Sequence, residues 1–235
     1  MLELREVVKR YELGDGEPVR AVDGVSLAVG AGELVALYGP SGSGKTTLLM
    51  LIAALLRPDG GGVYMDGRNV SELSERDGAR YRLWELGFVR QSLNLLAGAS
   101  ALDNAALKLM GTDLGVGEAH RRVIPLLERL GLGERCSQRA EHLSMGERQR
   151  VMIARALSTD PKLVLADEPT GSLDSARTRE VLTLLTEICR ERRAAVLLVT
   201  HDPRAAAYAD RVHALHDGRL VEYEPDRAFA PSSVE

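Results

Sequence analysis

The sequence has little material for covalent or metal cross-links. It contains two cysteines, Cys136 and Cys189, which lie far apart and form no CxxC pair. Neither a disulfide framework nor a zinc site is therefore expected, and the composition suits a reducing compartment. We interpret both residues as small buried hydrophobic side chains.

A membrane-spanning segment is also missing. The longest apolar run, Leu48–Leu56, has nine residues, whereas a spanning helix needs about 20. The first residues show no basic segment followed by an apolar one, so no secretory signal is expected. We therefore expect a chain that does not cross a membrane by itself, although it could dock on a partner that does.

Excess positive charge is the third missing feature. The 235 residues carry a formal net charge of −4, whereas nucleic-acid-binding proteins usually have a basic surplus. A nucleic-acid partner is therefore not expected. The chain is 45% hydrophobic and 27% charged, which is typical of a folded protein of one large or two small domains.

Buried strands and helical segments alternate along the chain. Three segments are apolar at consecutive positions, as strands covered on both faces of a parallel sheet are: Leu34–Tyr38, Leu163–Ala166 and Ala194–Val199. Helical patterns occur at Thr46–Leu56, Gln149–Leu157 and Ala176–Arg190. This alternation predicts a layered α/β domain with a parallel-sheet core.

Other segments predict smaller parts around that core. Val25–Val29 alternates with period two, Val63–Met65 precedes an Asp-Gly turn, and residues 212–223 are typical of a hairpin. A small antiparallel β subdomain is therefore expected. Residues 92–149, approximately, have a helical pattern and predict an inserted helical subdomain. We expect one domain over residues 1–223 and a short C-terminal tail over residues 224–235.

Residues 39–47, GPSGSGKTT, match the phosphate-loop pattern GxxxxGK[ST]. A buried strand is expected before them and an apolar helix after them, a context that a chance glycine-rich turn lacks. The glycines let backbone N–H groups point at phosphates, and the helix adds its positive end. We expect Lys45 to bridge the β- and γ-phosphates and the Thr46 hydroxyl to bind Mg²⁺. The pattern predicts a nucleoside triphosphate site.

Two consecutive carboxylates follow another buried strand. Asp167 and Glu168 come directly after Leu163–Ala166, at the end of the strand where ligands bind in open α/β sheets. Such a pair alone could be a solvated turn, but the phosphate loop favours a functional role. We expect Asp167 to hold Mg²⁺, through water, and Glu168 to act as the general base on the attacking water.

A third segment has the pattern of a helix start. Ser144 and Glu147 are spaced as a capping box, ahead of an alanine-containing apolar helix. The segment could be an ordinary capped helix. A helix N-terminus with serine and glycine is, however, also an anion site. A chain that already has one phosphate loop would use a second anion site if two copies met head to tail. Each helix end would then complete the nucleotide site of the other copy.

Together these elements resemble the ATP-binding cassette (ABC) ATPases, over nearly the whole chain. LSMGE at residues 143–147 resembles the LSGGQ signature of that family, and Gln91 matches its Q-loop glutamine. Gly171–Asp174 is similar to the D-loop, and His201 to the switch histidine. Tyr11, 28 residues before the phosphate loop, is similar to the aromatic residue that stacks on adenine.

The resemblance implies a P-loop (RecA-like) fold and an ATPase that closes as a homodimer around two ATP molecules with Mg²⁺. Each site would combine the phosphate loop of one subunit with the signature of the other. The candidate catalytic residues are Glu168, His201 and Gln91. The candidate nucleotide-binding residues are Tyr11, Gly39, Pro40, Ser41, Gly42, Ser43, Gly44, Lys45, Thr46, Thr47, Ser144, Gly146, Glu147 and Asp174, and the candidate metal ligands are Thr46, Gln91 and Asp167.

The sequence departs from the family pattern at two positions. Met145 replaces the first glycine of the signature, but Gly146, whose backbone we expect to approach the phosphate most closely, is retained. Arg90 stands where relatives commonly have a hydrophobic residue, and we interpret it as a neutral exposed charge in preference to a residue that tunes coupling to a partner.

Two classes of ABC ATPase compete as functional hypotheses. Relatives that act on DNA carry long coiled-coil or zinc insertions, whereas Gln91 and Leu143 are only 52 positions apart here. Relatives that act on ribosomes carry two cassettes. The sequence therefore favours a motor subunit that is cytoplasmic and held on the inner face of the membrane by a separate permease. Residues 11–27, 87–96 and 101–105 most resemble the lipoprotein-release, macrolide-export and cell-division subgroup; importer ATPases are the alternative.

Overall fold

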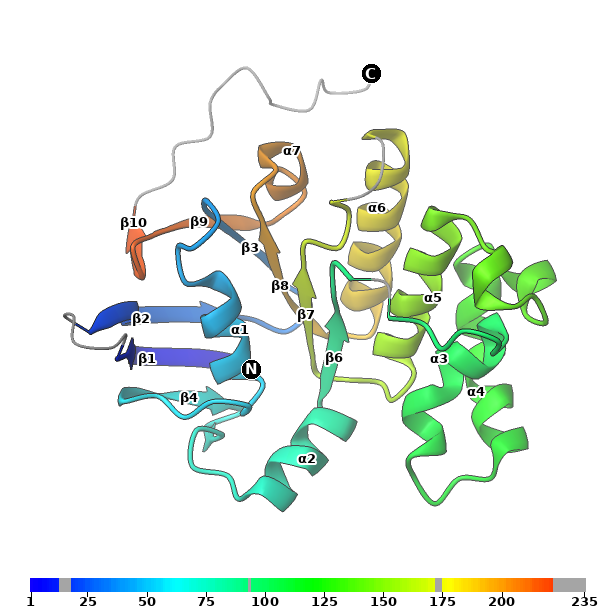
Figure 1. Ribbon diagram of the computed structural model, residues 1–235, viewed down its shortest axis with the longest axis horizontal. Helices are drawn as coiled ribbons and strands as arrows, with labels where there is room; N and C mark the ends of the chain where they lie inside the picture. Colours follow the sequence, from blue (N-terminus) through cyan, green and yellow to red (C-terminus); the bar gives the residue numbers. More distant parts are fainter. Residues whose placement is uncertain (13–17, 93, 172–174, 222–235) are drawn as a thin grey trace.

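The computed structural model describes residues 1–12, 18–92, 94–171 and 175–221 (Figure 1). Its strands are β1 (Leu2–Tyr11), β2 (Val19–Val29), β3 (Leu34–Tyr38), β4 (Gly60–Met65), β5 (Arg68–Asn69), β6 (Leu86–Val89), β7 (Leu163–Asp167), β8 (Ala195–Thr200), β9 (Arg211–His216) and β10 (Arg219–Val221). Its α-helices are α1 (Lys45–Ile52), α2 (Glu75–Trp84), α3 (Ala101–Met110), α4 (Val116–Arg129), α5 (Met145–Leu157), α6 (Ser175–Glu191) and α7 (Pro203–Ala206). Two short 3-10 helices lie at Gly133–Arg135 and Ala140–His142.

The strands form two sheets. The larger has the order β10-β9-β3-β8-β7-β6, parallel from β9 to β6, with β10 antiparallel at its edge. The smaller has the order β2-β1-β4-β5 and is antiparallel throughout. The expected α/β fold with a parallel core and a small antiparallel β region is therefore confirmed.

The larger sheet separates two hydrophobic cores, because side chains alternate between its faces. Along β3, Leu34 and Ala36 belong to one core, whereas Val35 and Leu37 belong to the other. The second core also contains α1 and the smaller sheet. Coverage on both faces explains why the central strands are apolar at consecutive positions.

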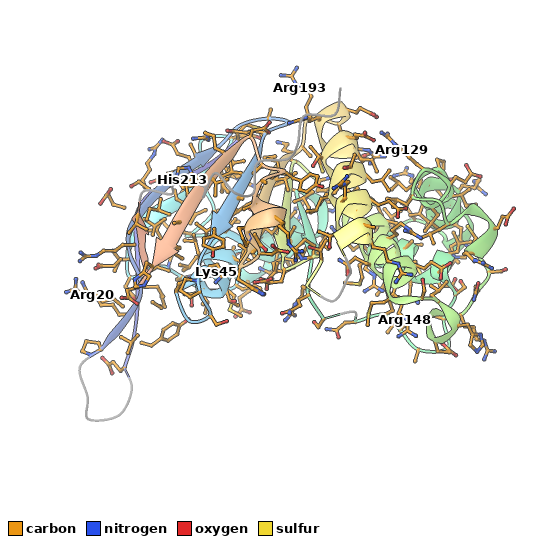
Figure 2. The ribbon with its side chains drawn as sticks, turned by 90° about the horizontal axis from the view of Figure 1, so that it is seen from above. Arg20, Lys45, Arg129, Arg148, Arg193 and His213 are labelled. Carbon is orange, nitrogen blue, oxygen red and sulfur yellow. The ribbon has the colours of Figure 1, made fainter. Side chains whose placement is uncertain are left out.

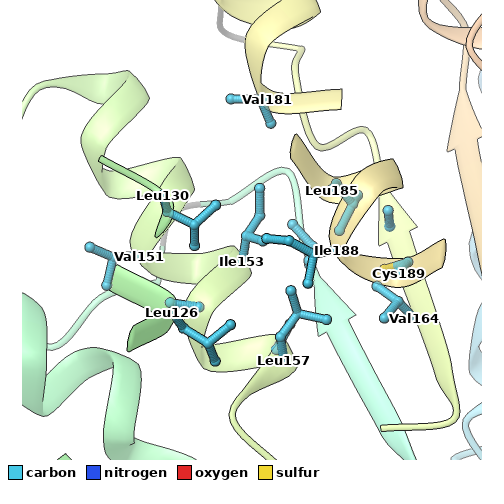
Figure 3. Packing of buried hydrophobic residues seen from close by; sticks show 14 of the residues in the cluster. Leu126, Leu130, Val151, Ile153, Leu157, Val164, Val181, Leu185, Ile188 and Cys189 are labelled. Atoms are coloured by element: carbon cyan, nitrogen blue, oxygen red, sulfur yellow. The ribbon is translucent and has the colours of Figure 1, made fainter. Parts of the chain in front are cut away.

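The first core holds the helices on the other face of the sheet. Side chains of α4, such as Leu126, pack with Ile153 of α5, and α5 packs in turn against Leu185 of α6 (Figure 3). In Figure 1 α3 and α4 lie at the edge of the molecule, beyond α5. This helical region contains the segment expected near residues 92–149; the limits given for it, for the domain and for the tail stay predictions.

The helix after the phosphate loop is shorter than the sequence expectation. The helix predicted at Thr46–Leu56 ends at Ile52, because Ala54 adopts a left-handed backbone conformation with φ 51°. The predicted hairpin is present as β9 and β10, joined through Asp217 and Gly218, both with positive φ. Its last predicted residues, 222 and 223, lie outside the described part of the chain.

Candidate nucleotide site

The phosphate loop joins β3 to α1. Gly39 donates a backbone hydrogen bond to the Thr200 carbonyl at the end of β8 (3.3 Å), which fixes the start of the loop. The Lys45 ammonium donates to the carbonyls of Gly39 and Pro40, each at 2.7 Å. The lysine side chain therefore lies along the loop, with its charge at the concave side where phosphates would bind.

Two glycines of the loop are required by close contacts. Gly44 has φ 104°, and a Cβ there would lie 2.0 Å from the Ala21 carbonyl oxygen of β2. A Cβ on Gly39 would lie 2.3 Å from the Leu215 carbonyl oxygen of β9. Both distances are far below van der Waals contact, so side chains at these positions would displace β2 or β9. The loop is thus clamped between two strands.

The two carboxylates sit beside the loop at the end of β7. Burial and the neighbouring Glu168 raise the pKa of Asp167, and the charges of Arg90 and Lys45 act against that rise. Burial likewise lowers the pKa of Lys45, against the charges of Glu168 and Asp167. A further positive charge in this place, such as a divalent cation, would favour the ionised form of Asp167.

Glu168 is held in an unusual conformation against His201. Its φ is 49°, which is uncommon for a residue other than glycine and is often found at functional sites. Its backbone N–H donates to the Val199 carbonyl (2.9 Å), and its Oε1 lies 2.5 Å from His201 Nδ1. His201 follows β8, so neighbouring strand ends bring the carboxylate and the imidazole together.

Residues of the phosphate loop and the two carboxylates line one pocket of about 300 Å³, whereas His201 is not among its lining residues. Gln91 reaches it from the loop after β6, while Asp167 and Glu168 reach it from β7. From the sequence-predicted set, the lining contains Ser41, Gly42, Gly44, Lys45, Thr46, Thr47, Gln91, Asp167 and Glu168. The structure therefore assembles most of the predicted phosphate and metal site from segments far apart in the sequence.

The donor atoms in this pocket suit magnesium. Thr46 offers a hydroxyl, Gln91 an amide oxygen and Asp167 a carboxylate, all hard oxygen ligands. Among the described residues, no group of three His, Cys, Asp or Glu side chains could hold a metal ion by itself. Mg²⁺ usually takes one or two carboxylates and completes its shell with substrate phosphates and water.

The predicted signature residues are not part of this pocket. Ser144 caps α5: it accepts from the Glu147 N–H at 3.3 Å, and its own N–H donates to the Glu147 carboxylate at 2.8 Å. Ser144 is exposed, whereas Gly146 is buried. Figure 2 shows Arg148, from the same helix, well apart from Lys45. Within one chain, this helix end and the phosphate loop do not meet.

Five other predicted residues are not among the lining residues: Tyr11, Gly39, Pro40, Ser43 and His201. Tyr11 is at the end of β1, paired with Val19 and 38% exposed, and is not among the lining residues. Asp174 lies outside the described residues. The sequence analysis also missed Ala21, which lines the pocket, since its place depends on β2 crossing the loop.

Arg90 lies near the nucleotide pocket. It is exposed, as expected, but it lies close enough for its charge to act on Asp167. The adjacent Gln91 lines the nucleotide pocket. Only the pairing of β6 with β7, which places both strand ends together, reveals this neighbourhood.

Comparisons with known proteins agree with the fold. The family model described as "ABC transporter" matches residues 22–171. The lipoprotein-releasing system ATP-binding protein LolD 2 of Caulobacter vibrioides is 48% identical over 92% of this chain and 93% of its own length. The macrolide export ATP-binding/permease protein MacB of Hyphomonas neptunium is 44% identical over 94% of this chain, which spans 34% of that protein.

A solved structure extends the likeness to three dimensions. The ATP-binding cassette MJ0796, in a dimeric post-hydrolysis state bound to ADP and Pi, is similar with a TM-score of 0.86 and 35% identity. The match covers 96% of this chain and 98% of that one. Sequence family, curated relatives and fold thus agree, and the chain belongs to the nucleotide-binding ATPases of the ABC transporter family.

Proposed function

We propose that the chain is the ATP-hydrolysing subunit of a membrane transport complex, and that it works as a homodimer around two ATP molecules. The observation that carries this proposal is the division of the site. Lys45, Thr46, Asp167 and Glu168 meet at one pocket, whereas the capped end of α5 lies elsewhere on the same chain. A second copy placed head to tail would bring Ser144 and Gly146 against the phosphates.

The residues of the pocket divide the chemistry among them. Lys45 would neutralise the β- and γ-phosphates, and Thr46, Gln91 and Asp167 would hold Mg²⁺, whose charge stabilises the transferring phosphoryl group. Glu168 would accept a proton from the attacking water as general base. His201, beside Oε1 of Glu168, would fix the orientation of that carboxylate and contact the γ-phosphate. Tyr11 would stack on the adenine, and Asp174 would contribute from the D-loop.

Replacing Glu168 by Gln tests this division of roles. The amide keeps the shape of the side chain but cannot accept the proton, so phosphate release should fall at least about 100-fold. ATP should still bind and should hold two copies together, which size-exclusion chromatography with saturating ATP would detect as a dimer. A hydrolysis-deficient variant that stays monomeric under these conditions would contradict the head-to-tail dimer.

The partner that we propose is a separate integral-membrane permease. Among the described residues, no helix is both long and apolar enough to pass through a bilayer. The names of the relatives support a membrane complex of the lipoprotein-release or macrolide-export kind. We propose that the chain lies at the cytoplasmic face of that complex. Isolating the tagged chain from detergent-solubilised membranes should recover a membrane subunit with it.

The alternatives give different results in the same tests. An importer ATPase would be recovered with a permease that lacks a large extracytoplasmic domain. A soluble ABC ATPase would be recovered without a membrane protein, and DNA or ribosomes would stimulate its ATP hydrolysis. The acidic net charge of −4 argues against that second alternative.

A further inference from the structure

The hairpin of β9 and β10 contacts the phosphate loop directly. Its turn consists of Asp217 and Gly218, with φ 45° and 76°. The Gly218 N–H donates to the Ser43 carbonyl at 3.1 Å. Ser43 lies in the middle of the loop and is only 3% exposed. This hydrogen bond therefore joins the hairpin turn to the backbone of the loop.

Strand β2 holds the same turn through Asp23. The Asp23 N–H donates to the Gly218 carbonyl at 2.8 Å. Arg219, the residue after Gly218, donates from Nε and Nη2 to Oδ2 of Asp23, at 2.8 and 2.7 Å. Arg20 adds a longer contact to the same carboxylate, at 3.3 Å. Asp23 therefore binds both the main chain of the turn and the side chain that follows it.

The contact between Asp23 and Arg219 is an ion pair at the edge of the fold. The Asp23 side chain is 14% exposed, and the Arg219 side chain is 66% exposed. The hydrogen bond from Arg219 lowers the pKa of Asp23, against the opposite effect of burial, and Arg20 lowers that pKa further. The carboxylate is therefore ionised at neutral pH and binds a guanidinium that stays charged.

The turn, β2 and the loop leave little free space between their backbones. A Cβ on Gly218 would lie 2.8 Å from the Arg20 carbonyl oxygen. A Cβ on Gly44 would lie 2.0 Å from the Ala21 carbonyl oxygen and 3.6 Å from Gly218 Cα. Strand β2 thus contacts the turn at Arg20 and the loop at Ala21. Because closely packed groups transmit displacement, a shift of the turn would move the loop.

The ion pair is close to the nucleotide pocket but is not part of it. Asp23 and Arg219 line a separate hollow of about 760 Å³. Ala21 and Gly42 line both this hollow and the nucleotide pocket, whereas Asp23 and Arg219 do not line the nucleotide pocket. The ion pair can therefore affect a bound nucleotide only through the backbone of β2 and the loop.

We propose that Asp23 and Arg219 are positioning residues for the phosphate loop. Their ion pair fixes the Gly218 turn, and the turn fixes the Ser43 carbonyl, so that the backbone N–H groups beside Ser43 keep the spacing that phosphates require. The inference rests on the proposed function in one respect, that the phosphate loop binds ATP. It does not depend on a second copy or on a membrane partner.

Arg219→Ala, Arg219→Lys and the control Arg211→Ala test the proposal. Arg211 forms a similar pair with Glu33 at 2.5 Å, but it lies at the start of β9, at the opposite end of that strand from the turn.

Equilibrium binding of a fluorescent ATP analogue measures the Kd of each full chain. We expect Arg219→Ala to raise Kd about fivefold, as loss of an ion pair does, and the two other variants to stay within about twofold of wild type. The kcat of Arg219→Ala at saturating ATP should stay within about twofold of wild type, because Glu168 is unaltered.

Two further measurements separate positioning of the loop from stability of the hairpin. Hydrogen–deuterium exchange of the peptide that covers residues 39–47 should be faster in Arg219→Ala and unchanged in Arg211→Ala. Asp23→Asn, which keeps the backbone N–H, should raise Kd as Arg219→Ala does. The double variant should raise Kd no further, because both changes remove the same pair. Denaturant unfolding shows that each variant is folded.

The two proposals fail in different ways. If the wild-type chain does not bind the ATP analogue, the proposed function fails. If wild type binds it and Arg219→Ala has the same Kd, the proposed function stands and the positioning role fails. Equal weakening of binding in Arg211→Ala and Arg219→Ala would also overturn the positioning role, because the effect would then come from the stability of the hairpin.

Discussion

Met145 is the residue at which the signature differs most from its family. Its side chain is 46% exposed at the first position of α5, while Gly146 beside it is buried. A Cβ on Gly146 would lie 3.6 Å from Arg177 Cδ, which is an ordinary van der Waals contact. Because Gly146 is buried, a long side chain would have less room there than at the exposed position 145.

Met145→Gly should change ATP turnover by no more than about threefold, because the glycine costs only about 0.5–1 kcal/mol in a helix. Phosphate release at saturating ATP measures this. Gly146→Met, one residue further, should abolish most of the activity of a correctly folded chain. If Met145→Gly has the larger effect, position 145 faces the nucleotide and the assignment of Gly146 is wrong.

Single residues could be predicted from the sequence where their neighbours are local. The phosphate loop depends only on the strand before it and the helix after it. Lys45 and Thr46 could therefore be identified from a motif of nine consecutive residues. The effect of Arg90 on Asp167 could not be predicted from the sequence. The two residues are 77 positions apart, and only the pairing of β6 with β7 brings them close. No local pattern reports such a contact.

At the scale of elements, the capped start of α5 has two roles that can be separated. The Ser144 side chain accepts a hydrogen bond from a backbone N–H at the start of α5, in a capping box with Glu147. Ser100 forms the same kind of capping box with Asp103 at the start of α3. Replacing either serine by Ala should therefore cost about 1 kcal/mol of stability, as loss of an N-cap does. The two caps provide a matched pair for the activity measurement.

Only Ser144→Ala should also impair ATP hydrolysis, because only this helix end is proposed to meet the nucleotide of the other copy. Denaturant unfolding compares the stabilities, and phosphate release at saturating ATP compares the rates. Equal loss of activity in Ser144→Ala and Ser100→Ala would mean that Ser144 acts through the stability of its helix alone.

Helix α3 is attached to the sheet by a buried ammonium. Lys108 donates to the Leu86 carbonyl of β6 and to the Thr159 hydroxyl at 3.0 Å, and burial lowers its pKa to about 8. Between pH 8 and about 10.4, the unfolded chain therefore binds one more proton here than the folded chain does. The free energy of unfolding should rise with pH in this interval, by at most about 1.4 kcal/mol per unit.

The difference in unfolding free energy between wild type and Lys108→Met isolates this effect, and it should increase from pH 7.5 to 9.5. Lys162→Met is the control. The ammonium of Lys162 pairs with Asp66 at 2.6 Å, which raises its pKa, so its contribution stays constant or declines as pH rises. If the difference in unfolding free energy between wild type and Lys108→Met does not change with pH, the pKa of Lys108 is not lowered in the folded chain.

Some elements gave too weak a pattern to be predicted. Helix α2 buries only Gly78 and Tyr81 and is otherwise polar or charged, so it has no apolar period. Strand β6 has four residues, fewer than periodicity needs. Strand β6 matters for the candidate site, because the loop after it carries Gln91, which lines the nucleotide pocket. The strand that positions Gln91 was thus harder to predict than the elements around the phosphate loop.

At the scale of the whole molecule, the parallel sheet fixes two sites that one chain cannot use together. The carboxyl ends of β3, β7 and β8 converge on the phosphate loop, while α5 belongs to the helical core beyond the sheet. Because both parts pack in well-filled cores on opposite faces of the sheet, α5 cannot reach the loop of its own chain without breaking one core. This separation is the reason that we propose completion of the site by a second copy.

Mixing two inactive variants provides the sharpest test of that arrangement. Lys45→Ala removes the phosphate-loop charge, and Ser144→Arg blocks the signature, so neither homodimer has an intact site. A mixed dimer has one site in which the loop of the Ser144→Arg copy meets the signature of the Lys45→Ala copy, both unaltered. Phosphate release should therefore reappear on mixing, up to about a quarter of the wild-type rate if copies pair at random in a head-to-tail dimer. The mixture would stay as inactive as its components if each chain hydrolysed ATP alone. The same result is expected if the phosphate loop of one copy faced the phosphate loop of the other.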